Sequence, residues 1–419
     1  MKKIAIFTTF FEAESGYSLI TVADTQIKML LNNGYSPMVM VQDNFIEPNN
    51  SKSVWKEEII DLRKVLPSFN LDNGISVNFE SRVETIEKVL EDNLNGFDVC
   101  ITHDIILQQW YKEYNIAMRN YAKKRPDLLW LHWLHSCPTP ANVKEYPNNC
   151  RFSSPPGYII YPNNTDLALV NQTYGLFGKE WKAKALRHTL DPLESLEYDK
   201  LTKDIIKKSG FYKADINIIY PIRMDKGKQP EKVIRLVAGI KLLGYTPSLL
   251  IIDWQSGGSH FQSYINELTV LASSLNLEGN VHFTSRLDDR CDQGVPRKVV
   301  NELMDLSTIY IHPSRVETYS LVVHEAMLRG KLVVLNHDFP VMRELFGDLA
   351  IYMDFGSDRN NRTYLPDEQT FWNDEAKRLI SEYKQNRALV AQSKMRKEYA
   401  PDSIWKDFEL LFYLMPIGE

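Results

Sequence analysis

The sequence predicts an α/β protein built from two doubly wound, Rossmann-like units, each with a parallel sheet. Three observations support this fold class. At 419 residues the chain is too long for one compact core, so about two domains are expected. Short β-rich runs alternate with amphipathic stretches of about ten to fifteen residues, which is typical of strand–helix units around a parallel sheet. A proline and a run of charges interrupt this alternation at about residues 186–200, where we expect the join.

The strand candidates follow one another in both halves of the chain. In the first half they are residues 3–10, 36–43, 97–104, 127–135 and 167–171. In the second half they are residues 215–223, 247–253, 281–285, 308–314, 331–336 and 350–355. Each is followed by helical periodicity. In such sheets ligands bind at the carboxyl ends of strands, beside helix N-termini, and a cleft between two such domains is the default site.

The composition excludes several classes of protein. With 44% hydrophobic and 25% charged residues, the chain has the composition of a globular protein. The apolar run after Lys3 ends at Glu12 without a small-residue cleavage site, so it predicts a first strand and not a signal peptide. No apolar stretch reaches the roughly 18 residues of a membrane span, so any membrane contact would be peripheral. Four scattered cysteines make no disulfide framework, which favours a cytoplasmic protein.

Polar side chains follow four of the predicted strands. They are His103 with Asp104, His135, Arg223 with Lys228, and Glu317. Any one of them taken alone is as well explained as a solvated loop residue. The set as a whole favours a binding site at the carboxyl ends of the strands.

The second half contains the parts of a diphosphate site. Arg223 and Lys228 lie five residues apart across the turn between a strand and a helix, where a guanidinium fork and an ammonium would clamp two phosphates. Residues 318–321 begin a helix, whose unpaired N–H groups and dipole favour an anion. Glu325 lies one turn into this helix and Glu317 just before it. Because carboxylates only accept hydrogen bonds, they would bind hydroxyls on either side of a diphosphate, a ribose and a sugar.

These motifs resemble the donor domain of GT-B glycosyltransferases, specifically glycosyltransferase family 4. The segment PSRVETYSLVVHEAMLRGKLVV from Pro313 is similar to the family pattern PSxxEGFGLxxxEAMAxGxPVV, with its two glutamates separated by seven residues. The family's arginine, four residues and lysine are matched in YPIRMDKGK. Arg343 and Glu344 resemble the arginine–glutamate pair of a later turn.

The resemblance extends over nearly the whole chain. DVCITHD and WLHWLHS resemble the family's two histidine-bearing strands, and HTLD at residues 188–191 stands where the family enters its linker. SIWKDF near Trp405 resembles the last helix, which crosses back to the first domain. The resemblance therefore implies an acceptor-side domain of residues 1–190 with about 400–419, a donor domain of residues 191–399, and a cleft between them. Two family glycines are replaced by Thr318 and Ser320, and an N-terminal glycine pair is reduced to Gly16.

The implied activity is transfer of a hexosyl or pentosyl group from a nucleotide sugar to a hydroxyl acceptor, with retention of anomeric configuration. By position, Glu325 would hold the ribose and Glu317 the sugar hydroxyls. Arg223 and Lys228 would neutralise the leaving diphosphate, which is the task of a metal ion in other enzymes. Since the chain has no Asp-x-Asp triplet, a metal-independent enzyme without a cofactor is expected.

The resemblance also assigns further site residues. The further donor-binding residues would be Thr318, Tyr319, Ser320 and Leu321. The acceptor-side candidates are Gly16 and His103, to which the charge of a loop in the first domain adds Lys144 and Arg151. His135 would contact the donor sugar from the first domain. His132 is the alternative, but residues three apart on a strand face opposite ways, so one of the two histidines belongs to the core.

Other classes of protein explain fewer of these features. His132, His135, Cys137 and Cys150 are a weak zinc candidate, because the same strand geometry keeps the histidines apart. The segment FFEAESGYS lacks the GxGxxG of a dinucleotide oxidoreductase, and no Walker A motif occurs. A nucleotide-sugar epimerase and a non-catalytic nucleotide-sugar binder remain alternatives to a transferase.

The acceptor is indicated only by charge. Residues 1–104 carry 9 Lys and Arg against 16 Asp and Glu, whereas residues 105–190 carry 11 against 5. The basic part contains KKRP at 123–126 and a loop that interleaves Lys144 and Arg151 with aromatic residues. Such a surface suits DNA with a hydroxymethylated base, an anionic membrane or simply solvent. A small or lipid-linked acceptor and a nucleic acid therefore both stay open, and no signal identifies the donor base, the sugar or the oligomeric state.

Overall fold

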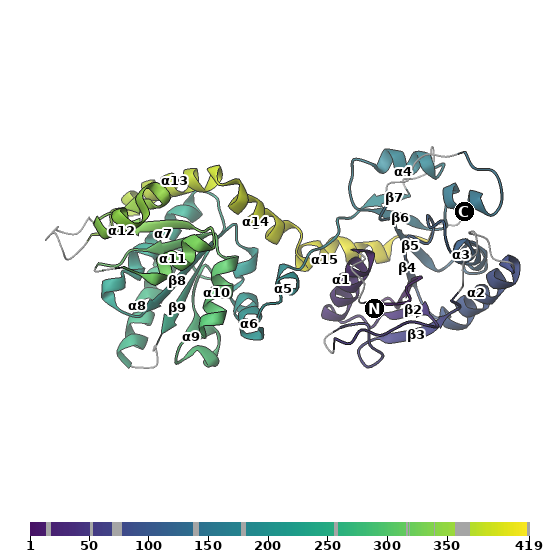
Figure 1. Cartoon of the computed structure of the whole chain (residues 1–419), viewed down its shortest axis with the longest axis horizontal. Helices are drawn as coiled ribbons and strands as arrows, with labels where there is room; N and C mark the ends of the chain where they lie inside the picture. Colours follow the sequence, from purple (N-terminus) through teal and green to yellow (C-terminus); the bar gives the residue numbers. More distant parts are fainter. Residues whose placement is uncertain are drawn as a thin grey trace. The chain divides into compact units, whose positions relative to one another are not determined.

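The computed structural model places most of the chain in two compact units. It describes residues 1–13, 18–50, 53–68, 78–136, 142–176, 182–254, 259–315, 317, 319–338, 340–356 and 369–416. The first unit comprises Met1–Leu190 with Tyr399–Glu419, and the second comprises Asp191–Glu398. Each unit contains one parallel sheet with helices around it (Figure 1).

The first sheet has seven parallel strands in the order β3-β2-β1-β4-β5-β6-β7. The strands are β1 Ile4–Phe7, β2 Met38–Gln42, β3 Asp61–Leu66, β4 Val99–His103, β5 Leu129–Trp133, β6 Tyr158–Tyr161 and β7 Ala183–Ala185. The helices are α1 Ser18–Asn32, α2 Phe79–Asn93, α3 Lys112–Lys124, η1 Asn148–Phe152, α4 Leu167–Thr173, α15 Pro401–Leu410 and η6 Leu411–Tyr413. The strand order reverses between β1 and β4, so this is the topological switch point of the first sheet.

The second sheet has six parallel strands in the order β10-β9-β8-β11-β12-β13. The strands are β8 Ile216–Arg223, β9 Pro247–Trp254, β10 Val281–Phe283, β11 Ile309–His312, β12 Leu332–Asn336 and β13 Ile351–Met353. The α-helices are α5 Pro192–Ser195, α6 Lys200–Ser209, α7 Pro230–Leu242, α8 Ser259–Ser274, α9 Thr284–Leu287, α10 Arg297–Leu306, α11 Leu321–Leu328, α12 Pro340–Phe346, α13 Gln369–Gln385 and α14 Arg387–Glu398. The 3₁₀ turns are η2 Phe211–Lys213, η3 Lys226–Lys228, η4 Asp289–Cys291 and η5 Gly347–Leu349. Here the switch point lies between β8 and β11.

Alternate residues of the central strands bury opposite faces of each sheet, as the two-residue period of a strand requires. In β1, Ile4 and Ile6 belong to the core that contains α1, whereas Ala5 and Phe7 belong to the core that contains α2 and α3. In the second unit, Ile309 of β11 packs into the core with α7 and α13. Its neighbour Tyr310 packs on the other face, with α6, α10 and α11. The doubly wound α/β architecture predicted from the sequence is therefore confirmed.

The C-terminal segment completes the first unit, as expected. Ile404 and Phe408 of α15, with Leu411 and Phe412 beyond it, are buried in the same core as α1. The hydroxyl of Tyr35 donates a hydrogen bond of 2.9 Å to Glu409. The segment is therefore part of the hydrophobic core of the first unit.

The prediction of a strand at 167–171 is wrong, because these residues form the helix α4. The run LALVN is short, and periodicity cannot distinguish a short buried helix from a strand. Three strands were not predicted from the sequence. Of these, β3 carries Arg63 and Lys64 at the edge of the sheet, β7 has only three residues, and β6 follows a proline-rich loop. Within the described part of the chain, no helix is both long enough and apolar enough to cross a bilayer.

Candidate functional site

The switch point of the second sheet brings together two segments that are about 90 residues apart in the sequence. From β8 come Arg223 and, through η3, Lys228; from β11 come Ser314 and Glu317. The Nζ of Lys228 donates to Ser314 Oγ at 3.2 Å and lies 3.7 Å from Glu317 Oε2. The lysine and the first glutamate of the predicted diphosphate site are thus neighbours in space.

Hydrogen bonds between main-chain and side-chain groups fix the two loops to one another. The N–H of Arg315 donates to the carbonyl of Gly227 at 2.8 Å. The buried Gln229 donates to the carbonyl of Pro313 at 2.5 Å. Asn336, at the end of β12, donates to the carbonyl of Ser314 at 3.0 Å. These bonds hold the carboxyl ends of β8, β11 and β12 in one arrangement.

Glu317 is hydrogen-bonded to His312, a residue that was not predicted from the sequence to belong to the site. Its Oε2 lies 3.0 Å from Nε2 of His312, the last residue of β11. The other ring nitrogen, Nδ1, lies 2.9 Å from the hydroxyl of Tyr310. Burial lowers the pKa of His312, and the hydrogen bond to Glu317 opposes this effect. Because Tyr310 and His312 are two residues apart on a strand, their shared face was a signal in the sequence.

Glu325 lies one turn into α11 and carries an ion pair of its own. The guanidinium of Arg297, at the start of α10, donates a hydrogen bond to its carboxylate. The Arg297 side chain is 76% exposed, whereas that of Glu325 is 20% exposed. Sequence reasoning missed Arg297, since only the fold places α10 beside α11.

Arg223 is less closely engaged than Lys228. Its side chain is 58% exposed, and its guanidinium lies 3.3 Å from Asp225 in the same turn. The structure therefore places Arg223 at the same edge of the sheet as Lys228 but in a solvent-facing ion pair with a local partner. A surface pair of this kind is weak, so the guanidinium is available to an anion.

The helix α11 begins at Leu321, and Ser320 precedes it in a left-handed conformation with φ of 56°. This is the position where the related family pattern has glycine, and a side chain is disfavoured there. Tyr319 is 49% exposed and its ring stacks on His324, with centroids 4.7 Å apart. Leu321 is also exposed. Thr318 lies outside the described residues.

The switch point of the first sheet holds a column of three histidines, which we call the histidine column. His103 ends β4 and His135 follows β5; Nδ1 of His103 lies 3.0 Å from Nε2 of His135. The ring of His188 stacks on His135 with centroids 4.9 Å apart. Burial lowers the pKa of all three, that of His135 to about 3. The column is therefore uncharged at neutral pH and offers hydrogen bonds without a charge.

Asp104, the residue after β4, is hydrogen-bonded to the main chain of the histidine column. Its carboxylate accepts a hydrogen bond of 2.8 Å from the main-chain N–H of His135. Burial raises the pKa of Asp104 to about 6, and this hydrogen bond opposes the increase. His132, by contrast, is a core residue: its ring lies 2.8 Å from the Thr102 hydroxyl and 2.7 Å from the carbonyl of Pro156.

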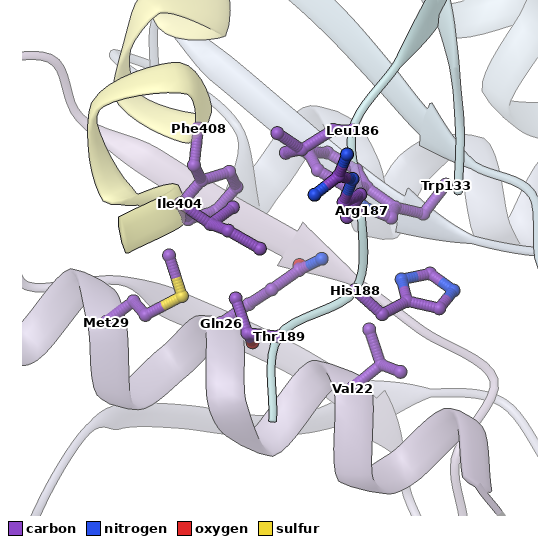
Figure 2. Close-up of a pocket in the computed structure, with 10 residues that line it drawn as sticks. All are labelled: Val22, Gln26, Met29, Trp133, Leu186, Arg187, His188, Thr189, Ile404 and Phe408. Carbon is purple, nitrogen blue, oxygen red and sulfur yellow. The ribbon is translucent and has the colours of Figure 1, made fainter. Parts of the chain in front are cut away.

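A small pocket lies next to the histidine column, between α1, residues 186–189 and α15 (Figure 2). Its walls are mostly apolar, with Trp133 and Phe408 among them. Gln26 and His188 supply two polar edges, and each has a buried side-chain atom without a hydrogen-bond partner, Oε1 and Nδ1 respectively. The pocket is too small for a nucleotide.

The acceptor-side candidates are not brought together into one surface. Lys144 is exposed, but Arg151 donates to the carbonyl of Leu107 at 2.8 Å and lies over the ring of Phe152. In KKRP, Lys124 pairs with Glu87 at 3.3 Å and Arg125 with Asp127 at 2.8 Å. Lys124 and Arg125 are thus paired with carboxylates, and Arg151 is held within its own unit. Gly16 lies outside the described residues.

The four residues of the zinc alternative do not form a site in the described structure. His132 and Cys150 are buried in the core, and Cys137 is outside the described residues. Across the ranges that the structure describes, no three His, Cys, Asp or Glu side chains are grouped so that they could hold a metal ion.

Comparison with known proteins finds a family match within the second unit. Residues 202–394 match the family described as glycosyl transferases group 1. Similar solved structures include a glycosyltransferase from Rickettsia africae, with 13% identity, 98% of each chain covered and a TM-score of 0.36. Anabaena Alr3699/HepE in complex with UDP has 15% identity, covers 98% of this chain and 100% of its own, and has a TM-score of 0.36. Comparison with curated proteins gives no significant match. Residues 202–394, which lie within the second unit, therefore match a glycosyltransferase group 1 domain.

Proposed function

We propose that the enzyme transfers a sugar from a nucleotide-sugar donor to a hydroxyl acceptor, with retention of anomeric configuration and without a metal ion, as in glycosyltransferase family 4. One observation carries this proposal. Lys228 lies 3.7 Å from Glu317, and Glu317 and Glu325 stand before and within α11, which follows β11 at the switch point of the second sheet. Ligands of doubly wound sheets bind at such a point.

The proposed donor site places charges where the reaction needs them. The first turn of α11 has N–H groups without helical partners, which favour an anion. Lys228 and Arg223 add positive charge at the ends of β8 and η3. As the sugar leaves, negative charge develops on the diphosphate, and fixed cations and N–H dipoles stabilise it. No metal ion is needed for this step.

The two glutamates are proposed to bind hydroxyl groups and not to exchange protons. Glu325, inside α11, would accept hydrogen bonds from the ribose. Glu317, before the helix and beside Lys228, would accept them from the sugar. The role of His135 at the sugar stays a prediction; as a neutral imidazole it would serve as a hydrogen-bond partner and not as a charge.

The acceptor is proposed to be a hydroxyl group of a glycan, a lipid-linked sugar or a small molecule. Lys124 and Arg125 pair with carboxylates and Arg151 donates to the carbonyl of Leu107, which makes these three basic side chains less available to a phosphate backbone. We therefore expect no salt-dependent retardation of duplex DNA in a gel. A clear retardation would favour transfer to a modified base instead.

A thermal-shift screen of nucleotide sugars in the presence of a chelator tests the proposal. A ligand that binds only the folded protein raises the unfolding midpoint. At least one nucleotide sugar is expected to do so with the chelator present. If no nucleotide or nucleotide sugar changes the midpoint, the donor site is wrong. Product analysis of the anomeric configuration by NMR then decides between retention and inversion.

A further inference from the structure

His312 connects a buried tyrosine to Glu317. Tyr310 and His312 lie on the same face of β11, and both side chains are buried. The Tyr310 hydroxyl is 2.9 Å from Nδ1 of His312, and Nε2 of His312 is 3.0 Å from Oε2 of Glu317. The result is a chain of two hydrogen bonds that runs from the core of the second unit to the proposed donor site.

These two hydrogen bonds fix which nitrogen of His312 carries the proton. A buried phenol stays protonated, because burial raises the pKa of Tyr310, so its O–H donates to Nδ1. A neutral imidazole then has its single proton on Nε2, where it donates to the carboxylate of Glu317. Ser320 makes a hydrogen bond with the same phenol, which ties the start of α11 to this network.

The neutral N–H of His312 matters because Lys228 also lies close to Glu317. The same oxygen of Glu317 that accepts from His312 lies 3.7 Å from Nζ of Lys228, which is longer than a charge-assisted hydrogen bond. Lys228 instead donates to Ser314 at 3.2 Å. Without His312, the ammonium 3.7 Å away is a strong partner within reach of the carboxylate, and a tight pair between them would neutralise the charge that a diphosphate needs.

We propose that His312 is a positioning residue of the donor site: locked by Tyr310 as a neutral Nε2–H donor, it holds Glu317 toward the sugar hydroxyls and keeps Lys228 available to the diphosphate. This inference rests on the proposed function for the identity of the ligand. The hydrogen-bond chain itself does not depend on it, so the two can be tested separately.

The first test is the tautomer of His312, measured by ¹⁵N NMR of the imidazole side chains in the full chain. We expect one protonated nitrogen, Nε2, and one bare nitrogen, Nδ1, at neutral pH. The conservative variant Tyr310→Phe removes the lock, and we expect it to give a mixture of tautomers. A proton on Nδ1, or a doubly protonated ring at neutral pH, would overturn the inference.

The second test is calorimetric binding of UDP, GDP and ADP, which lack the sugar. For whichever nucleotide binds the wild type, His312→Leu should weaken binding about tenfold, since Glu317 then captures Lys228. His312→Gln, which keeps an N–H donor near the Nε2 position, should stay within about threefold. The matched control is His282→Leu on the edge strand β10, where the ring is hydrogen-bonded to the carbonyl of Gly279, and binding should not change.

A double variant separates this mechanism from a general loss of structure. Glu317→Gln carries no charge and cannot capture the ammonium, so His312→Leu with Glu317→Gln should recover most of the lost affinity. Unchanged binding in His312→Leu, or no recovery in the double variant, would show that His312 does not act through Glu317. If none of the three nucleotides binds the wild type, the proposed function fails, whereas the tautomer still decides the arrangement of His312.

Discussion

Arg297, at the start of α10, donates a hydrogen bond to Glu325, the carboxylate proposed to bind the ribose. The ion pair is partly exposed to solvent, since the side chain of Arg297 is 76% exposed. An exposed ion pair of this kind contributes about 0–1 kcal/mol to stability. Its consequence for function is larger, because Arg297 and the ribose hydroxyls would use the same carboxylate.

Arg297→Gln should therefore change the free energy of unfolding by less than about 1 kcal/mol. It should also strengthen nucleoside diphosphate binding by up to about fivefold, as the competing donor is removed. Urea denaturation and calorimetry measure the two effects. Weaker binding in the variant would mean instead that Arg297 contacts the nucleotide directly.

The two glutamates should separate in their effects on the donor. Glu325→Ala is expected to abolish the thermal shift produced by both nucleoside diphosphates and nucleotide sugars, because the ribose is common to them. Glu317→Ala should leave the shift with nucleoside diphosphates and reduce the differences between sugars on the same nucleotide. Thermal-shift titrations of both variants decide this, and an unchanged response in both would refute the roles assigned here.

Ser320 allows a test of the backbone at the start of α11. With φ of 56°, this position favours glycine over any residue with a Cβ by about 1 kcal/mol. Ser320→Gly and Ser320→Ala both lose the hydroxyl, so their comparison isolates the backbone: the glycine variant should be the more stable. At Ser381, on the exposed face of α13, the alanine variant should instead be the more stable, by about 1 kcal/mol. The same order at both positions would contradict the left-handed conformation.

Asp104→Asn should stabilise the first unit in a pH-dependent manner. Burial raises the pKa of Asp104 to about 6 in the folded protein, above its unfolded value near 4. Below about pH 4 the carboxyl group is protonated in both states and does not lower the free energy of unfolding. Above about pH 6 its ionisation lowers the free energy of unfolding by up to about 3 kcal/mol. Asparagine avoids this cost, tolerates the left-handed backbone of this position, where φ is 53°, and can accept the same hydrogen bond.

The gain from Asp104→Asn should accordingly grow between pH 4 and pH 6 and then level off. Urea denaturation at several pH values measures it, with the transition of the first unit assigned by hydrogen exchange. The histidine column titrates in both proteins, so its contribution cancels in the difference. Asp92→Asn, on an exposed face of α2, is the control and should show no such trend.

Phe408→Ala tests the contribution of the C-terminal segment. The side chain is buried against Trp133 and the core of α1, so its loss should cost about 3–5 kcal/mol of the stability of the first unit. Leu410→Ala, in the same helix but 57% exposed, should cost less than about 1 kcal/mol. Equal losses would mean that α15 does not pack as described.

Much of the fold was predictable because its signals are local. Ten of the strands appear in the sequence as β-rich runs, and the central ones are apolar on both faces since helices cover both. The wrong and missing strand predictions also reflect the local nature of these signals. Residues 167–171 carry too short a pattern to distinguish helix from strand, and β3 and β7 lie at or near an edge, where neighbours and not their own side chains define them.

The sequence by itself determined the order of the strands and helices and the local spacing of the donor motif, with Glu317 before a helix and Glu325 within it. The tertiary structure decided which of these residues meet. Lys228 reaches Glu317, and Arg297 reaches Glu325, only because strands and helices far apart in the chain become neighbours in the sheet and beside it. The same applies to the histidine column, drawn from three separate segments. Side-chain contacts depend on strand order and register, which long-range packing sets and local spacing does not.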